Sequence, residues 1–154
     1  EDVMAVLNGG FVQYARVESD CVVRKPAHCR IEQAAALPIA YLTAYYALVV
    51  RANLQPGERV LIHSAAGGVG LAALHIAKRC GAQIFATAGS EQKRDYLLSL
   101  GVHAVADSHD EQFAATLLTA SNSKPNLLHQ STASFRCSST LQVQRITFAP
   151  SVLR

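Results

Sequence analysis

Apolar and polar positions change their spacing along the chain, and the first change comes near residue 30. Before it, short apolar stretches separated by turns predict strands over Val3–Leu7, Phe11–Val17 and Cys21–Arg24. After it, the chain is rich in alanine, and apolar side chains recur at helical spacing from Ile31 to about Ala52, with Pro38 as a helix-start signal. The first thirty residues are too few to bury a core alone, so they need a neighbouring unit.

A second pattern begins near residue 60, where apolar runs of strand length alternate with helical repeats. Strands are predicted over Val60–Ser64, Gln83–Ala88 and Val102–Ala106. Helices are predicted over Leu71–Arg79, Glu91–Leu100 and Glu111–Thr119, with Gly81 and Gly101 ending the first two. This alternation indicates an α/β fold with right-handed parallel βα units, the first three of a Rossmann-type doubly wound sheet.

The alternation stops after Ala120. Residues 121–154 contain seven serines, and their apolar residues are too sparse to form a buried strand. A doubly wound nucleotide-binding sheet needs a fourth strand at this point. We therefore expect a divergent, disordered tail over 121–154, an exposed edge on the strand at 60–64, marginal stability and aggregation.

Composition and charge are those of an ordinary globular protein. Of the 154 residues, 50% are hydrophobic and 16% charged, and no unbroken apolar run approaches the roughly 18 residues of a membrane span. The net charge of +3 comes from the tail, because residues 1–111 hold ten basic and eleven acidic side chains, whereas residues 112–154 hold four basic ones and no acid. We expect a cytoplasmic protein that binds neither nucleic acid nor a membrane.

Two further features of the sequence limit its chemistry. The four cysteines, Cys21, Cys29, Cys80 and Cys137, fit neither a metal-ligand pattern nor a disulfide framework, so we expect reduced thiols and no metal. The chain opens with Glu1 rather than Met, and we expect a processed chain or a piece of a longer one.

The junction between the strand at 60–64 and the helix at 71–79 is glycine-rich and reads Ala65-Ala66-Gly67-Gly68-Val69-Gly70. Backbone N–H groups in the first turn of a helix lack intrahelical partners, and the helix dipole favours an anion there. We assign Gly67 to the approach of a diphosphate, Gly68 to the conformation of the turn and Gly70 to close packing of helix on strand. The alternative is a glycine-rich turn that binds nothing.

The end of the second strand favours NADPH over NADH. Domains selective for NAD usually place Asp or Glu there to bind the ribose 2′-hydroxyl. Here the strand ends with Gly89-Ser90, and Glu91 lies beyond it in the helix. Ser90 can donate a hydrogen bond, while Lys93 and Arg94 offer cations within one helical turn. The alternative is that Lys93 and Arg94 form a solvated helix face.

Three segments in order resemble one family. They read LPIAYLTAYYAL over 37–48, PGERVLIHSAAGGVG over 56–70 and GSEQKR over 89–94, with Gly10-Phe11 near the start. The combination is similar to the enoyl reductase domain of polyketide synthases and animal fatty acid synthases. That domain belongs to the zinc-independent, quinone-oxidoreductase-like branch of the medium-chain dehydrogenase/reductase superfamily. The resemblance covers about residues 1–120.

The resemblance implies a division into domains and an activity. Residues 1–36 correspond to the last strands of a GroES-like substrate domain, and 37–120 to the first half of an NADP-binding Rossmann domain. The implied reaction is NADPH-dependent reduction of the double bond of an enoyl thioester, with hydride going to the β-carbon and a proton to the α-carbon. The implied partners are an acyl thioester carried on an acyl carrier protein and, in the intact family member, a second copy of the enzyme.

The resemblance also implies which residues contact the cofactor. The diphosphate contacts are Ala66, Gly67, Gly68, Val69 and Gly70. Lys93, with help from Ser90, contacts the 2′-phosphate, and Thr43 lies near the nicotinamide. Ser108 and His109 fall where relatives often carry Ser-Arg beside the adenosine, so this sequence departs from the family pattern at that basic contact.

The residues assign no proton donor. Tyr41 and Tyr45 are candidates, but their helical spacing is more typical of core positions. His63 ends a buried strand and is expected to be a packed side chain. The remaining histidines show no partner at useful spacing, and we give none of them a catalytic role.

Three functions stay open on the sequence. The motifs favour an enoyl reductase module or fragment of a synthase, and a free-standing quinone or enone oxidoreductase is the alternative within the same superfamily. The tail favours a third, a non-catalytic truncated fragment. We expect this chain to hold at most the adenosine diphosphate half of NADPH, because the segment that lines the nicotinamide is not recognisable in residues 121–154.

Overall fold

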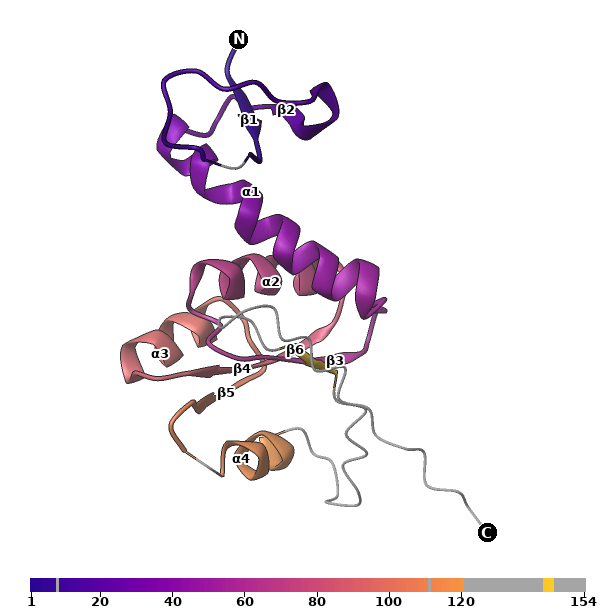
Figure 1. Cartoon of the computed structure of the whole chain (residues 1–154). Helices are drawn as coiled ribbons and strands as arrows, with labels where there is room; N and C mark the ends of the chain where they lie inside the picture. Colours follow the sequence, from indigo (N-terminus) through magenta and orange to yellow (C-terminus); the bar gives the residue numbers. More distant parts are fainter. Residues whose placement is uncertain (8, 111, 121–142, 146–154) are drawn as a thin grey trace.

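The computed structural model describes residues 1–7, 9–110, 112–120 and 143–145, and its main feature is a four-stranded sheet (Figure 1). The strands are β3 (Arg59–Ile62), β4 (Gln83–Ala88), β5 (Ala104–Asp107) and β6 (Val143–Arg145), in the order β5-β4-β3-β6. β3, β4 and β5 are parallel, whereas β6 pairs with β3 in the antiparallel direction. The predicted parallel α/β unit is thus confirmed.

The helices cover both faces of this sheet. They are α1 (Ile31–Tyr45), extended by the π-helical segment η2 (Tyr46–Arg51), α2 (Gly68–Arg79), α3 (Glu91–Ser99) and α4 (Phe113–Ala120). Side chains alternate between the faces along each strand. On one face Ile62, Ile84 and Ala86 pack with residues of η2, α2 and α3, while Leu61 and Phe85 on the other face pack against α4. The region from β3 to α4 is therefore a layered core with α2 beside the sheet (Figure 1).

The N-terminal segment has less regular structure than its sequence predicts. β1 (Val3–Ala5) and β2 (Val22–Arg24) pair in an antiparallel hairpin-like unit, with a short 3₁₀ turn η1 (Ser19–Cys21) before β2. The strand predicted over Phe11–Val17 is wrong, because no strand forms there and the side chains of Phe11 and Tyr14 are exposed. Apolar alternation alone does not make a strand when no neighbouring strand is at hand to pair with it.

The start of α1 also differs from the sequence expectation. The helix begins at Ile31, and Pro38 lies within it rather than at its first turn. The local reason is the cap, because the backbone N–H of Arg30 donates to Gln33 Oε1 at 3.1 Å. A hydrogen bond of this kind, made by the third residue of a helix, fixes where the helix starts.

The sequence predicts an exposed edge on β3, and this prediction is wrong. Val143 lies opposite Ile62 and Arg145 opposite Val60, so β6 covers that edge in the described structure. A strand with only three residues therefore supplies the missing backbone partners of β3. The disordered tail expected over 121–154 otherwise lies outside the described residues.

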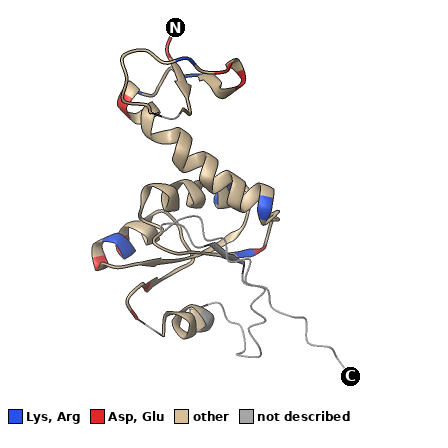
Figure 2. Ribbon diagram, viewed as in Figure 1, with Lys and Arg blue, Asp and Glu red and all other residues tan. Residues whose placement is uncertain are grey.

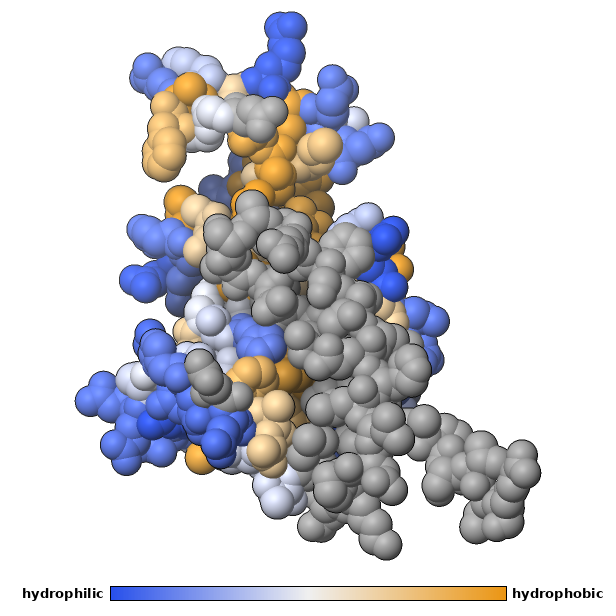
Figure 3. All heavy atoms as spheres, turned by 60° about the horizontal axis from the view of Figure 1, so that its bottom comes forward, coloured by the Kyte–Doolittle hydropathy of each residue, from blue (hydrophilic) through white to orange (hydrophobic). Residues whose placement is uncertain are grey.

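The continuous helix from Ile31 to Arg51 carries an unusually apolar surface. No Lys, Arg, Asp or Glu lies between Glu32 and Arg51, and Figure 2 shows this uncharged length. Its outward side chains are more than half exposed at Ile39, Leu42 and Val50. Apolar atoms are visible in the narrow waist where α1 joins the N-terminal strands to the sheet (Figure 3).

By length and composition this helix could cross a membrane, with a mean hydropathy of 1.4 and 17% of that window buried. The sequence expectation rested on unbroken apolar runs, whereas this test uses the mean hydropathy of the helix. The finding is weak evidence for a span, because a core helix passes the same test. Ala44 and Leu48 are fully buried against the sheet domain.

Candidate nucleotide-binding site

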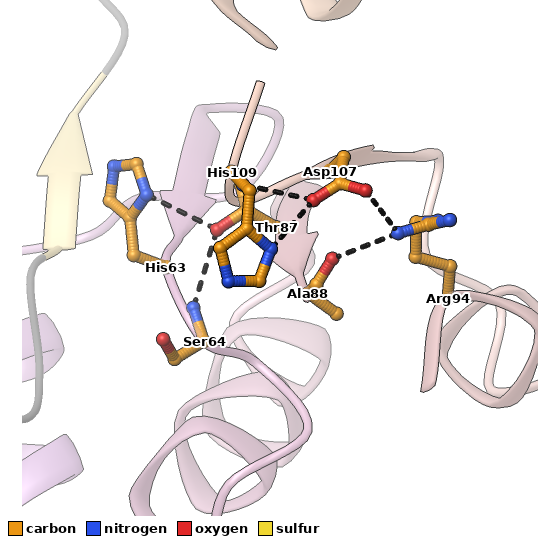
Figure 4. Close-up of polar contacts among 7 residues, drawn as sticks. All are labelled: His63, Ser64, Thr87, Ala88, Arg94, Asp107 and His109. Atoms are coloured by element: carbon orange, nitrogen blue, oxygen red, sulfur yellow. Dashed lines mark hydrogen bonds and ion pairs between the residues drawn. The ribbon is translucent and has the colours of Figure 1, made fainter. Parts of the chain in front are cut away.

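The turn between β3 and α2 is held in place by the end of the neighbouring strand β4. The hydroxyl of Thr87 accepts a hydrogen bond from the backbone N–H of Ser64 at 3.3 Å, and its carbonyl accepts one from Ala65 at 3.1 Å. Thr87 Oγ1 also lies 3.2 Å from His63 Nδ1 (Figure 4). Ser64 has a φ of 51°, a left-handed conformation that these bonds stabilise.

Sequence reasoning gave no role to Thr87, although the side chain is fully buried. The signal was present, because Thr87 is a polar residue within the apolar run Ile84–Ala88 of this strand. A buried hydroxyl almost always has a hydrogen-bond partner, and here the partners are in the glycine-rich turn. Thr87 is therefore a positioning residue for that turn.

The three glycines of the turn differ in the space around them. A Cβ on Gly70 would lie 2.6 Å from both the Cα of Ala65 and the carbonyl oxygen of Ser64, so Gly70 lets α2 pack closely on the turn that follows β3 rather than on the strand itself. A Cβ on Gly67 would lie 3.3 Å from the same oxygen, whereas Gly68 has nothing within 4 Å. The role given to Gly68 in the conformation of the turn is wrong, because the left-handed residue is Ser64.

This geometry leaves an open place at the start of α2. Gly67 is the N-cap, and the backbone N–H groups of Gly68, Val69 and Gly70 belong to the first turn, where N–H groups have no partner within the helix. Gly68 is exposed, and Ala66 is half-buried against the core. The arrangement suits an anion, because amide hydrogens and the positive end of the helix dipole face the same open space.

A second group of residues gathers where β4 and β5 end. Ser90 is the N-cap of α3 and makes no side-chain capping bond. Ser108 follows β5, and its Oγ would lie 3.2 Å from a Cβ placed on Gly89. Lys93 lies on the exposed face of the first turn of α3, and within the described ranges it makes no ion pair. The structure thus brings Ser90 and Ser108 to one edge of the sheet, with Lys93 one helical turn away.

Arg94 has neither of the two roles that the sequence left open. Its Nη1 lies 2.8 Å from Asp107 Oδ2 and donates to the carbonyl oxygen of Ala88 at 3.3 Å (Figure 4). The side chain is 26% exposed, so it is neither a free cation nor a fully solvated group. Arg94 joins α3 to the ends of β4 and β5.

The carboxylate of Asp107 is the acceptor that organises this edge. Its Oδ1 accepts the backbone N–H of His109 at 2.9 Å and lies 3.2 Å from His109 Nδ1. The pKa of Asp107 is lowered, chiefly by the bond from the His109 backbone; desolvation opposes this, and the imidazole and Arg94 add to it. Asp107 therefore stays ionised at neutral pH and holds the loop after β5.

Thr43 is not joined to this site by any hydrogen bond among the described residues, and it lies half-buried in α1. Tyr41 is committed elsewhere, because its hydroxyl is 2.7 Å from His75 Nδ1 on α2. His75 lies seven residues after Gly68 in the helix, or about 10 Å along its axis. Tyr41 therefore ties two helices together, while Tyr45 is half exposed.

Besides His63 and His109, two further histidines have partners that the sequence did not reveal. His75 pairs with Tyr41, and His103 Nδ1 accepts the backbone N–H of Ile84 at 3.1 Å. These partners lie 34 and 19 residues away in the chain, so only the fold brings them together. Among the described residues the structure holds no group of three His, Cys, Asp or Glu suited to a metal ion, and Cys21, Cys29 and Cys80 are free thiols.

Known proteins are similar to this chain in both sequence and fold. The family model described as zinc-binding dehydrogenase matches residues 68–140. A subunit of the phenolphthiocerol/phthiocerol polyketide synthase of Mycobacterium tuberculosis is 47% identical over 116 residues, covering 75% of this chain and 5% of that protein. The crystal structure of the CurK enoyl reductase matches with a TM-score of 0.65 and 47% identity, over 68% of this chain and 31% of that one.

Two further structures bear on the nucleotide. The nucleotide-binding subdomain of the enoylreductase domain of PpsC from Mycobacterium tuberculosis matches with a TM-score of 0.52 and 54% identity, over 54% of this chain and 46% of that one. The quinone oxidoreductase of Thermus thermophilus, solved also as a complex with NADPH, matches with a TM-score of 0.57 and 33% identity, over 65% and 34% of the two chains. These neighbours support a pyridine nucleotide as the class of cofactor.

The fold is similar to that of the nucleotide-binding part of these oxidoreductases. These matches support assignment of the chain to the medium-chain dehydrogenase/reductase superfamily, as a fragment similar to the enoyl reductase domains of polyketide synthases. It spans 5% of the length of the synthase subunit described above, and less than half of each solved neighbour.

Proposed function

We propose that this chain binds NADPH as part of an enoyl reductase domain that reduces the double bond of an enoyl thioester. The observation that carries the proposal is the pairing of two adjacent features at the carboxyl ends of parallel strands. One is the open first turn of α2, and the other is the Ser90 and Ser108 edge with its exposed lysine. A doubly wound sheet binds its dinucleotide at such strand ends.

The diphosphate fits the first turn of α2. Gly68 leaves space that a side chain would fill, and the amides of Gly68, Val69 and Gly70 are the donors for phosphate oxygens. Gly67 and Ala66 lead the chain into this turn, and Gly70 lets α2 lie close to it. Ser64, fixed by Thr87, holds the turn in the conformation that presents these amides.

The 2′-phosphate fits the neighbouring strand end. β4 itself ends without an acidic side chain, and the carboxylate of Asp107, in register with Ala88 on β5, is paired with Arg94. The hydroxyls of Ser90 and Ser108 can donate hydrogen bonds to a phosphate, and Lys93 supplies a positive charge on the exposed side of α3. Arg94 contributes indirectly, because it neutralises the carboxylate of Asp107 close by.

The remaining parts of the proposal concern the reacting end. NADPH supplies the hydride when bound, and Thr43 is the residue assigned to the nicotinamide side. The substrate is an acyl thioester, carried on an acyl carrier protein in the context of a synthase, and the intact enzyme works as a homodimer. No proton donor is assigned, because Tyr41 already bonds to His75.

A free-standing quinone or enone reductase is the second candidate. The Thermus thermophilus neighbour favours it, but at 33% identity against 47% for the CurK enoyl reductase. The two candidates share the nucleotide site and differ in the electron acceptor. A direct comparison of enoyl thioesters and quinones as acceptors with the enzyme that contains this chain separates them.

The nucleotide site is tested by titrating the ¹⁵N-labelled 154-residue chain with NADPH and with NADH. We expect shifts of the Gly68 to Leu71 amides with both, and tighter binding of NADPH. Lys93→Ala should weaken the binding of NADPH by about tenfold and change the binding of NADH little, because one charge-assisted contact to the 2′-phosphate is lost. Arg79→Ala, which removes an exposed cation at the far end of α2, is the matched control. Absence of amide shifts with either nucleotide would overturn the proposal.

A further inference from the structure

His63 and Thr87 lie side by side on two strands, at the point where β3 ends and the glycine-rich turn begins. Ile62 lies opposite Ala86 in the parallel register of β3 and β4, and this pair comes next. His63 Nδ1 lies 3.2 Å from Thr87 Oγ1 (Figure 4). Side chains alternate between the faces of a sheet, so both residues project toward the face that α4 covers, as Phe85 does. The meeting of the two side chains is therefore built into the sheet.

A ring contact holds the imidazole in this orientation. The rings of His63 and Phe113, which belongs to α4, lie edge to face with their centroids 5.4 Å apart and their planes at 86°. Aromatic rings favour this arrangement. The imidazole is half-buried, and the hydroxyl that it meets belongs to a fully buried residue. Two elements, β4 and α4, therefore set the position of the imidazole.

The hydroxyl of Thr87 can serve its two partners with different functions. Its oxygen accepts the backbone N–H of Ser64 at 3.3 Å. A hydroxyl carries one hydrogen, which it can donate while its lone pairs accept. His63 Nδ1 is an acceptor within reach of that hydrogen. An accepting Nδ1 directs the hydrogen away from Ser64, so a lone pair of the hydroxyl faces the Ser64 N–H.

Ser64 is the residue on which the geometry of the turn depends. Its φ of 51° lies in the left-handed region, which is costly for a residue other than glycine and persists only where neighbours hold it. Its carbonyl oxygen accepts the N–H of Gly67 at 3.0 Å, and a Cβ on Gly70 would lie 2.6 Å from the same oxygen. A shift of Ser64 would therefore displace the start of α2 and its first-turn amides.

We propose that His63 is a positioning residue of the nucleotide site, and that it acts on Ser64 through the hydroxyl of Thr87. This inference rests on the proposed function, because the group that His63 positions is the turn assigned to the diphosphate. In this role the imidazole makes no contact with the nucleotide. Loss of the ring nitrogen should weaken diphosphate binding, although every group that contacts the diphosphate is still present.

The test measures the affinity for ADP by calorimetry on the 154-residue chain. His63→Phe keeps an aromatic ring beside Phe113 but lacks Nδ1. It should bind ADP about fivefold more weakly than the wild type, because one hydrogen bond is lost. Should this variant fail to fold, His63→Leu is measured in its place with the same expectation. His63→Asn, which offers an acceptor oxygen near the position of Nδ1, should bind ADP more tightly than His63→Phe.

A double-mutant cycle tests whether His63 acts through Thr87. Thr87→Val keeps the shape of the side chain and lacks the hydroxyl, so it should weaken ADP binding at least as much as His63→Phe. The double variant should bind ADP as Thr87→Val does, because without the hydroxyl the imidazole has no route to Ser64. Losses that add in the double variant would overturn the inference.

His103→Phe is the matched control. His103 Nδ1 accepts the backbone N–H of Ile84 at 3.1 Å, and its ring stacks on Phe85 with the centroids 6.1 Å apart. These are the same kinds of contact near the opposite end of β4. His103→Phe should lower the urea midpoint and yet bind ADP as the wild type does, which separates positioning of the turn from general stability.

The wild-type titration tests the proposed function separately from this inference. Shifts of the Gly68 to Leu71 amides on addition of ADP show that the turn binds a diphosphate. If these shifts occur and His63→Phe binds ADP as tightly as the wild type, the inference is wrong and the proposed function stands. If the wild type binds no ADP, the proposed function fails and the inference fails with it.

Discussion

The two sides of the long helix at 31–51 contrast sharply. Its inner side, at Ala44 and Leu48, is fully buried against α2 and the sheet, while its outer side exposes Ile39, Leu42 and Val50. Both sides are equally apolar in sequence. Hydropathy therefore does not distinguish the two sides of this helix. The neighbouring elements decide which of its apolar sides is buried.

We expect the greatest loss of stability from a substitution on the buried side of this helix. Leu48→Ala should lower the free energy of unfolding by about 2–5 kcal/mol, because it removes a fully buried side chain and leaves a cavity. Leu42→Ala, on the same helix but 56% exposed, should change it by less than about 0.5 kcal/mol. Urea unfolding followed by circular dichroism measures both. Equal losses in the two variants would show that the outer side is also covered in solution.

Two glycines of the glycine-rich turn should respond differently to alanine substitution, because one is crowded and the other is open. Gly70→Ala should destabilise the chain by about 1–3 kcal/mol, because its Cβ would lie 2.6 Å from backbone atoms that cannot rotate away. Gly68→Ala has open space around it and should keep or slightly raise stability, since alanine favours a helix. Gly68→Ala should nevertheless weaken nucleotide binding, because the methyl group fills the space assigned to the phosphate.

Unfolding and nucleotide titration of both variants test this pair. The two glycines are two residues apart in the chain, so each variant serves as the control for the other. If Gly68→Ala binds ADP as tightly as the wild type, the phosphate does not lie over this residue. If Gly70→Ala is as stable as the wild type, the close packing of α2 on the turn is not needed for the fold.

The sequence predicted the part of the molecule that depends on local signals. Strand β4 and helix α3 were located almost to the residue, because apolar alternation, glycine stops and caps all lie within a few positions of each other. The antiparallel β6 was missed, since its three residues form a strand only by pairing with β3, some eighty residues earlier. The strand predicted at 11–17 was wrong for the opposite reason, because these residues alternate like a strand but pair with no other strand in the described structure.

The site divides in the same way. The glycine-rich turn was readable, because its chemistry is encoded in six consecutive residues. The contacts of Thr87 with Ser64, and of Arg94 with Asp107, join positions 23 and 13 residues apart. No local pattern marks such pairs, since parallel strand ends are brought together only by the completed sheet. Residues that orient the site were therefore harder to predict than residues that form it.

The smallest effect we predict concerns this polar edge, where ion pairs rather than apolar burial join the elements. The pKa of Asp107 is lowered in the folded chain from an ordinary value of 3.8. A lowered carboxyl pKa stabilises the fold above the unfolded value, and this contribution is lost as the pH falls through the folded value. The urea midpoint of the wild type should therefore exceed that of Asp107→Asn at neutral pH, and the gap should close only below pH 3.8.

Urea midpoints measured for both proteins across the acidic range decide the point, with Asp95→Asn as the control. Asp95 is an exposed carboxyl on α3 for which the described structure shows no ion pair, so its variant should follow the wild type throughout. A gap between wild type and Asp107→Asn that persists unchanged to the lowest pH would mean that the carboxyl acts by shape or neutral hydrogen bonding. In that case the ends of β4 and β5, like the core beside them, would be joined without help from charge.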